Sequence, residues 1–226
     1  MTPTRTLRPF GWALVLSALI AVTGCAAPRP PTDYSAFKSS RPRSIVVLPP
    51  VNKSVEPQAS HSFLTYVSYP LAEGGYYVFP VSMVDEFFRE NGLTVADDVH
   101  ALPLAKLREV FGADAALFIT ITDYGARFAV IASNTIVTAK ASLVDLKSGT
   151  TLWSGAATAS SNENNQGSQG GLAALVVRAI IDQIASNVTE QSHRIAGITA
   201  SRLLTPGSRD GLLIGPRSPD YMKKDP

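Results

Sequence analysis

Apolar residues recur along this chain first with the spacing of helices and buried strands, and later with the spacing of an exposed sheet. Residues 45–48 form a continuous apolar run that two prolines end, as in a strand buried on both faces. Residues 59–73 place apolar side chains at helical spacing, and Pro70 is expected to end or kink that helix. A second strand is predicted at 76–80. This strand–helix–strand order predicts a parallel βαβ crossover in the N-terminal half.

Two further helices and a third strand are predicted before the pattern changes. The helices cover 82–91 and 103–111, and an acidic turn at 97–98 separates them. The strand covers 115–121. The apolar side chains expected to face inward from the two helices are Val84, Phe87, Phe88, Leu104, Leu107 and Val110.

From residue 128 to residue 160 the period becomes that of strands. One face would carry Ile136, Thr138, Lys140, Ser142 and Val144, and the other Val137, Ala139, Ala141 and Leu143. Residues 145–149 form a hairpin turn, and Trp153 is expected on the core face of the returning strand. The predicted fold class is therefore α/β (α+β): a mixed β-sheet with a βαβ N-terminal half, an antiparallel C-terminal meander and helices packed on the sheet.

Two apolar groups are candidates for a protein interface. A helix predicted at 172–195, after a polar loop, is apolar almost all round in its first turns, which include Leu172, Leu175 and Val176. Tyrosines cluster earlier in the chain, and tyrosine suits an interface because its ring is apolar and its hydroxyl stays hydrated. Burial in the core is the alternative for both groups: it is favoured for the helix and explains the tyrosines equally well. The clustered tyrosines are Tyr66, Tyr69, Tyr76 and Tyr77.

The N-terminus has the pattern of an export signal. Arg5 and Arg8 precede an uncharged apolar run, and small residues follow it up to Cys25. The ending Val-Thr-Gly-Cys resembles the lipobox of bacterial lipoproteins. That resemblance implies cleavage before Cys25 and attachment of fatty acyl chains, such as palmitate, to this residue. Ala26 stands where an aspartate would signal retention in the inner membrane, so the resemblance implies the outer membrane.

These patterns divide the chain into four parts. Residues 1–24 are the predicted lipoprotein signal peptide, and 25–43, rich in Pro, Ser and Arg, are a lipidated flexible tether. Residues 44–200 form the folded domain, and 201–226 a tail partly docked on it through the apolar triplet 212–214.

Composition excludes several classes of function. Without its signal peptide the chain has 18 basic and 18 acidic side chains, so a nucleic-acid partner is not expected. Cys25 is the only cysteine, which excludes disulfides and cysteine-ligated metals once it is acylated. The histidines His61, His100 and His193 lie in different elements without a metal-binding spacing. We expect no metal and no cofactor.

The chain also has few candidates for catalysis. It contains neither a G-x-S-x-G elbow nor a phosphate-binding glycine loop. Asp114 and Asp123 flank the third strand and are the carboxylates that a hydrolase would use. The other acids fit turns and helix caps better. The sequence favours a protein that is not an enzyme.

Five segments in order resemble a family of Gram-negative lipoproteins that includes a meningococcal surface-antigen candidate of the GNA type. They are Ser44–Pro50, Tyr69–Pro80, Pro103–Ala115, Val144–Gly155 and Gly215–Tyr221. Members of that family are commonly encoded beside a CsgG-like lipoprotein. A more distant likeness is to the N-terminal domain of TolB and to the domains of CsgG and LpoB. The resemblance implies a TolB-N/CsgG-like domain at 44–200 and supplies no catalytic residue.

We therefore expect an outer-membrane-anchored lipoprotein that acts as an accessory or assembly factor through protein–protein contacts. The expected partners are a CsgG-like lipoprotein or a second copy of the chain, on the periplasmic face rather than the cell surface. One alternative is an LpoB-like regulator of peptidoglycan synthesis. The other is a periplasmic hydrolase.

Overall fold

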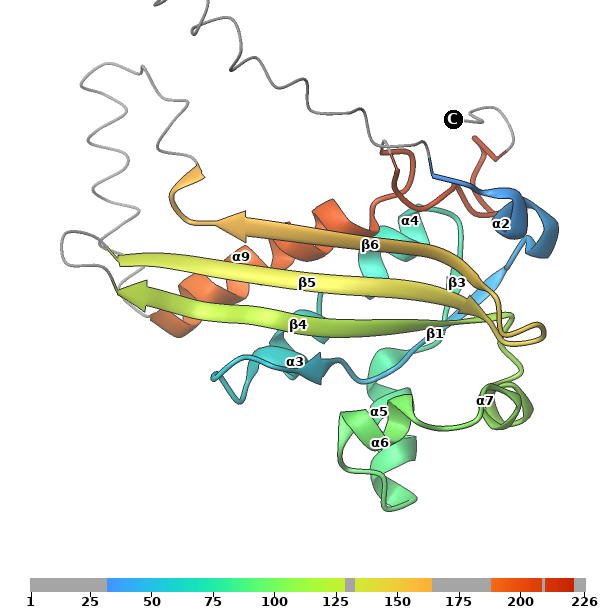
Figure 1. The fold of residues 1–226 in the computed structure, drawn as a ribbon, viewed down its shortest axis with the longest axis horizontal. Helices are drawn as coiled ribbons and strands as arrows, with labels where there is room; N and C mark the ends of the chain where they lie inside the picture. Colours follow the sequence, from blue (N-terminus) through green and yellow to red (C-terminus); the bar gives the residue numbers. More distant parts are fainter. Residues whose placement is uncertain (1–31, 129–132, 164–187, 209, 222–226) are drawn as a thin grey trace, which may run out of the picture. The chain divides into compact units, whose positions relative to one another are not determined.

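A single mixed β-sheet organises the folded part of the chain (Figure 1). The computed structural model describes residues 32–128, 133–163, 188–208 and 210–221. These residues belong almost entirely to one compact unit, Asp33–Pro226, and the account below concerns that unit. In spatial order, the sheet runs β3 (Tyr77–Val78), β1 (Ser44–Val47), β4 (Ala115–Phe128), β5 (Ser133–Asp145) and β6 (Thr151–Ser160), and the short β2 (Val51–Asn52) pairs with β4.

The N-terminal half is a parallel crossover, as predicted. β1 pairs in parallel with β3 on one side and with β4 on the other. The crossover contains α3 (Ala59–Leu64) and α4 (Ser68–Glu73). The predicted interruption near Pro70 is a full break between these two helices. It lies before the proline because Pro70 then falls in the first turn of α4, where its missing N–H removes no helical bond.

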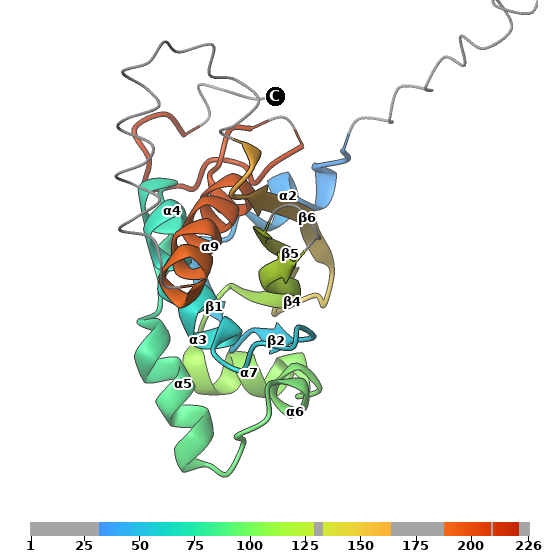
Figure 2. The same cartoon turned by 90° about the vertical axis from the view of Figure 1, so that its left-hand side faces the viewer.

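Both faces of β1 are buried, because its alternate side chains enter two different cores. Ile45 and Val47 join the larger core, which also contains residues of α2 (Ser35–Ser40), α3, α4 and α9 (Val188–Leu204). Val46 and Leu48 join the smaller core with α5 (Val81–Glu90), α6 (Ala96–His100) and α7 (Leu104–Phe111). Figure 2 shows the resulting grouping, with α9 alongside β4–β6 and α5–α7 together near β1 and β2.

The C-terminal half is the predicted antiparallel meander of β4, β5 and β6. The alternation predicted for β5 is confirmed: Val137, Ala139 and Leu143 are fully buried, whereas Lys140 is exposed. Trp153 is buried opposite Leu143. Up to Ile121, the odd-numbered side chains of β4 face the larger core. A register shift between Ile121 and Asp123 changes this alternation, so that the next side chain in the core is the even-numbered Tyr124.

Several local features differ from the sequence prediction. The acidic turn at 97–98 is part of the short helix α6. Phe87 and Val110, expected to face inward, are 36% and 42% exposed, because Val84, Phe88 and Leu107 fill the core beneath α5 and α7. Helix α2 lies within the segment expected to be a flexible tether and buries Phe37.

Helix α9 overlaps only the end of the helix predicted at 172–195 and continues to Leu204. Its buried residues include Ile195, Ala196, Ala200 and Leu204. Leu172, Leu175 and Val176 lie outside the described residues, as do Cys25 and the predicted signal peptide. Within the described ranges no helix has the length and apolar character needed to cross a bilayer.

Candidate interaction surfaces

Three aromatic side chains from separate elements hold the C-terminal segment against the domain. Trp153 Nε1 donates to the Asp210 carbonyl at 3.1 Å, and the Tyr34 hydroxyl donates to that of Gly211 at 2.5 Å. The Tyr76 hydroxyl donates to the carbonyl of Leu213 at 2.5 Å. Between these bonds Leu212 is buried. Of the apolar triplet 212–214, Leu212 is therefore part of the core and Leu213 packs against it.

The four clustered tyrosines have different surroundings. Tyr76 is a core residue, only 3% exposed, so its ring has almost no surface to offer a partner. Tyr66 packs on the ring of His193, with 4.7 Å between the ring centroids. Tyr69 and Tyr77 remain on the surface, 72% and 41% exposed. They are the members of the cluster that a partner protein can reach.

Tyr77 has neighbours of its own at the start of the sheet. Its ring meets Phe79 edge-on, with centroids 5.1 Å apart. The guanidinium of Arg217 lies 5.2 Å from its ring centroid, which is the geometry of a cation–π contact.

A polar cluster not foreseen from the sequence joins α3, β4 and α9. Ser62 Oγ lies 2.7 Å from His193 Nδ1, and the Tyr124 hydroxyl donates to the same oxygen at 2.5 Å. A nucleophilic serine would also need a group that orients the other ring nitrogen and N–H donors for an oxyanion. No described side chain bonds His193 Nε2. The cluster therefore resembles a structural connection more than an active site.

The two carboxylates considered for hydrolysis cannot act together. Asp114 directly precedes β4 and Asp123 lies within it, so the two are about 30 Å apart at the rise of a β-strand. Asp114 also accepts bonds from the backbone N–H groups of Arg43 and Ser44 and from the Ser44 hydroxyl, at 2.8, 3.0 and 3.1 Å. It thereby ties the start of β4 to the start of β1. The pairing of these two acids as a catalytic site is wrong.

The described histidines are also used locally. His100 Nε2 donates to the Pro49 carbonyl at 3.0 Å, and burial holds the pKa of His100 below its ordinary value. His61 is exposed. No group of three or more His, Cys, Asp or Glu side chains able to hold a metal occurs in the described part of the chain.

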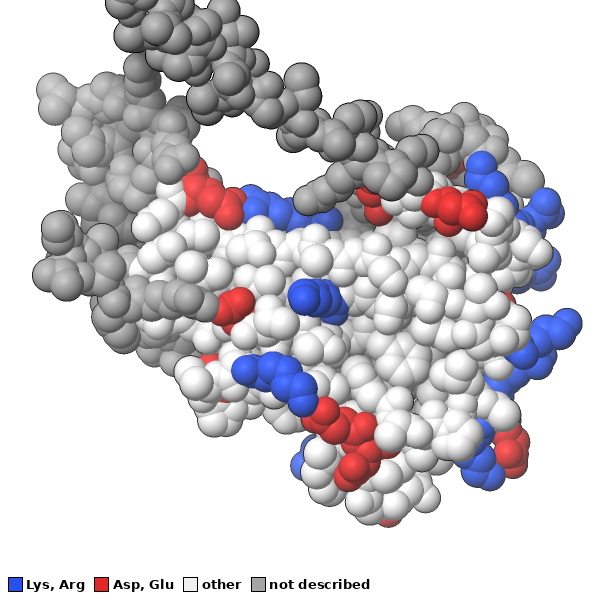
Figure 3. Space-filling view, in the orientation of Figure 1, with Lys and Arg blue, Asp and Glu red and all other residues white. Residues whose placement is uncertain are grey.

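The face of β4–β6 that points away from α9 is open and nearly free of charge (Figure 3). A shallow hollow on this face is lined mainly by small side chains, and its one charged residue is Lys140. The other lining residues are Phe118, Thr120, Ala141, Ser142, Ser154, Gly155 and Ala156.

Strand β6 forms one edge of the sheet and pairs only with β5 in the described residues. Over Thr151–Ser160 it contains no proline and no charged residue. The Thr158 carbonyl accepts a bond from Arg202 at 2.9 Å, so it points away from β5. Because backbone groups alternate sides along a strand, those of Ala156 and Ser154 point the same way. Natural edge strands usually carry a lysine, a proline or a bulge that discourages pairing. β6 has no lysine or proline, and its one register shift with β5 lies near its start, between Thr151 and Trp153.

The structure is thus an α+β domain whose candidate sites are contact surfaces on a mixed sheet. The family model described as "Putative lipoprotein GNA1162-like" matches residues 32–217, and the chain belongs to this lipoprotein family. The matched range coincides closely with the described fold. The resemblance stated from the sequence is confirmed.

Individual relatives agree with this assignment. A Neisseria meningitidis serogroup B protein described as "Putative lipoprotein NMB1124/NMB1162" is 43% identical over 205 residues, which cover 90% of this chain and 94% of the relative. The crystal structure of lipoprotein GNA1162 from Neisseria meningitidis matches with 44% identity and a TM-score of 0.52, covering 65% of this chain and all of that one. The LpoB C-terminal domain from Salmonella enterica matches at 15% identity and a TM-score of 0.39, over 52% of this chain and 82% of that one.

Proposed function

We propose that this protein is an outer-membrane lipoprotein, anchored through acyl chains on Cys25, that acts without catalysis as an accessory or assembly factor. Membership of a lipoprotein family and the lipobox-like ending at Cys25 support the anchor. Two or three acyl chains give stable membrane attachment, whereas one gives only marginal binding. The folded unit then faces the periplasm.

The observation that carries the proposed role in protein contacts is the edge of β6. Its outward backbone groups at Ser154 and Ala156 can accept an added strand, which is a common way for a sheet to bind another chain, whereas the Thr158 carbonyl is already bonded to Arg202. The adjoining open face has one charged side chain around its hollow, so a partner would have few ions to desolvate there. The proposed partner is a CsgG-like lipoprotein or a second copy of this chain.

Other surfaces remain part of the same proposal. Tyr69 and Tyr77 are exposed aromatic rings of the kind enriched at interfaces. Leu172, Leu175 and Val176 would add an apolar helix face from outside the described residues.

The experiment uses a proline at the β6 edge. Because the Ala156 N–H points away from β5, Ala156→Pro removes an outward donor without removing a bond of the sheet. Ala156→Ser keeps the donor and is the matched control. We expect detergent extracts to yield a co-purifying lipoprotein, or a self-associated form, with the parent and with Ala156→Ser, and at least about ten-fold less with Ala156→Pro.

Two results would contradict the proposal. One is a parent protein that is monomeric and recovers no partner. The other is equal recovery by Ala156→Pro and Ala156→Ser, which would exclude strand addition at β6. Thermal melting of both variants establishes that the fold is retained.

The regulator of peptidoglycan synthesis is the weaker alternative. Such a regulator must reach from the outer membrane through the wall. The folded unit begins at Asp33, so the segment from Cys25 to Asp33 spans at most about 28 Å when fully extended.

A further inference from the structure

Exposed cationic side chains gather at the end of the sheet where β1, β3 and β4 begin. Register defines this end: Ser44 lies opposite Tyr77, Ile45 opposite Ala115, and Ala115 opposite Asp145. We call it the basic end, and it comprises Arg41, Arg43, Arg108, Lys147 and Arg217, all exposed.

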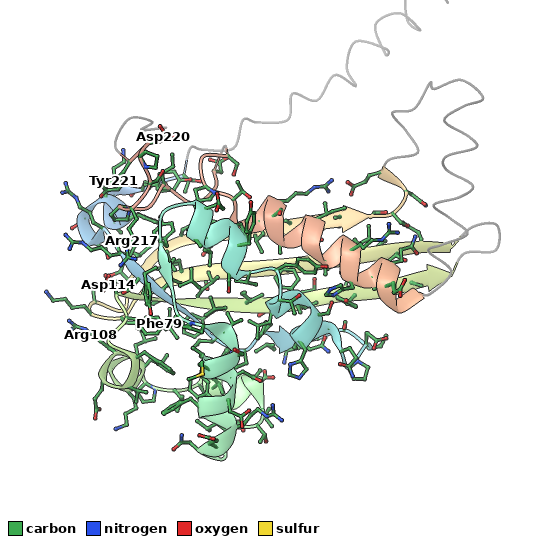
Figure 4. All side chains as sticks on the ribbon, turned by 180° about the vertical axis from the view of Figure 1, so that it is seen from behind. Phe79, Arg108, Asp114, Arg217, Asp220 and Tyr221 are labelled. Atoms are coloured by element: carbon green, nitrogen blue, oxygen red, sulfur yellow. The ribbon has the colours of Figure 1, made fainter. Side chains whose placement is uncertain are left out.

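Backbone and side-chain hydrogen bonds, together with the side-chain view, place these residues at one end of the sheet. The Arg43 N–H donates to Asp114, and the Lys147 N–H donates to Asp145. These two acids lie at the start of β4 and the end of β5. Arg41 follows Ser40, whose hydroxyl donates to Asp145. Figure 4 shows Arg108, Asp114 and Arg217 at this end of the sheet.

The basic end differs from most other cations of the domain in lacking ion pairs. Lys53, Arg89, Lys106 and Arg202 each form a salt bridge with a carboxylate. Among the described residues, none of the five cations of the basic end forms a salt bridge with a carboxylate. Their charges are therefore free to meet a negative surface.

Carboxylates at the same end offset only part of this charge, because two of them, Asp114 and Asp220, are exposed there (Figure 4). Asp145 is only 8% exposed and accepts bonds from Ser40, Lys147 and Ser148. Asp114 is occupied by Arg43 and Ser44. Other exposed acids lie on α5 and α6, which carry Glu86, Glu90, Asp97 and Asp98. The five cations of the basic end thus outnumber the exposed carboxylates there, and this end keeps a surplus of positive charge.

The chain enters the fold at the basic end. Helix α2, the first element of the folded unit, ends at Ser40 beside Asp145 and immediately before Arg41. If Cys25 is lipidated, as proposed above, the short segment before Asp33 keeps the start of the folded unit within about 28 Å of the bilayer, and α2 adds about 9 Å between that point and Arg41. That distance allows side-chain contact, and electrostatic attraction acts over about 8–10 Å at physiological salt.

We propose that the basic end docks on anionic phospholipid headgroups and so orients the domain on its membrane. Strands β1, β3 and β4 then begin at the bilayer. The end of β4 and the start of β5 point away from it. This proposal depends on the lipid anchor proposed above only for where in the cell the domain meets a membrane. The charge complementarity itself belongs to the folded unit and can be measured without the lipid.

The test uses the mature chain from residue 25 with Cys25→Ser, so that no acyl chain contributes. Its co-sedimentation is measured with vesicles of phosphatidylglycerol and phosphatidylcholine, and with vesicles of phosphatidylcholine alone. We expect binding only to the anionic vesicles, and we expect added salt to abolish it. Each cation near the surface contributes about five-fold to affinity, so Arg41→Gln, Arg108→Gln and Lys147→Gln together should weaken binding about 100-fold.

The control carries the same change of net charge elsewhere: Lys53→Gln, Arg89→Gln and Arg194→Gln. It should bind within a few-fold of the parent, and equal melting temperatures would show that both variants fold. Absence of binding to anionic vesicles, or an equal loss in the two triple variants, would overturn the proposal. So would unchanged vesicle binding by the first triple variant together with loss of a co-purifying protein, since the basic end would then serve a protein partner. None of these results depends on whether Cys25 is acylated.

Discussion

Gly75 and Gly215 approach one another backbone to backbone, and this contact fixes the C-terminal segment on the domain. A Cβ built on Gly215 would lie 2.6 Å from the Gly75 carbonyl oxygen, and one built on Gly75 would lie 2.4 Å from the Ser218 nitrogen. The flanking bonds are those from Gly215 N to the Gly74 carbonyl and from Arg217 N to the Gly75 carbonyl, at 2.7 and 3.0 Å. A side chain at either glycine would separate the two segments.

Gly75→Ala should destabilise the domain more than Gly92→Ala. Both residues have positive φ, +91° and +80°, so each alanine costs about 1–2 kcal/mol of backbone strain. Gly92 has no atom within 4 Å of the added methyl group, whereas Gly75 must displace the tail. We expect an additional loss of about 1–3 kcal/mol for Gly75→Ala in urea unfolding. Equal losses would mean that the tail contributes little to stability.

Ser62→Ala should destabilise the fold through two partners at once. Without the Ser62 hydroxyl, the buried Tyr124 hydroxyl loses its hydrogen-bond acceptor and His193 Nδ1 loses its hydrogen-bond partner. The expected loss in the free energy of unfolding is about 1–3 kcal/mol. Thr65→Ala is the control, because its hydroxyl bond to the Ser62 carbonyl is exposed and its loss should cost less. A Ser62→Ala protein as stable as Thr65→Ala would show that the cluster does not join α3 to α9.

Tyr76 should make the protein sensitive to alkali. Burial, reinforced by the nearby Tyr221, raises the pKa of Tyr76 well above its ordinary value of 10.0. The folded state therefore binds the phenol proton more tightly than the unfolded state does. This contribution to stability is complete below pH 10 and is lost as the pH rises above that value.

Thermal melts from about pH 8 to about pH 11 test this dependence. Tyr76→Phe should lower stability by about 1 kcal/mol at neutral pH, because the bond to Leu213 is lost. It should also flatten the decline at high pH. Burial raises the pKa of Tyr124 too, so part of the decline should remain. An unchanged decline in Tyr76→Phe would assign the alkaline sensitivity to other groups.

The regular elements could be predicted because short-range patterns determine them. The apolar run at 45–48 identified the central strand, and the period of two along β5 identified its buried face. Trp153 was placed correctly for the same reason. Pro70 predicted an interruption of the helix but not where the break would lie. The first turn of a helix accepts proline without losing a hydrogen bond, so the break could fall before Pro70.

The contacts that define the candidate surfaces could not be predicted from local pattern. Tyr34, Tyr76 and Trp153 meet the tail only because the sheet brings distant elements together. The same holds for Ser62 and His193. Tyrosine density alone did not separate the buried Tyr76 from the exposed Tyr77, because a tyrosine ring suits both environments. The position of β6 at the edge depended on the strand order, which the chain pattern left open.

Fractionation of cells that express the full chain or its Cys25→Ser variant tests the central claim most directly. With the parent we expect the protein in the outer-membrane fraction, retained after a high-salt wash that removes proteins held only by charge. The Cys25→Ser variant should appear in the soluble fraction and keep the parent's melting temperature. A Cys25→Ser protein that stays on the membrane after the salt wash would contradict the lipoprotein account.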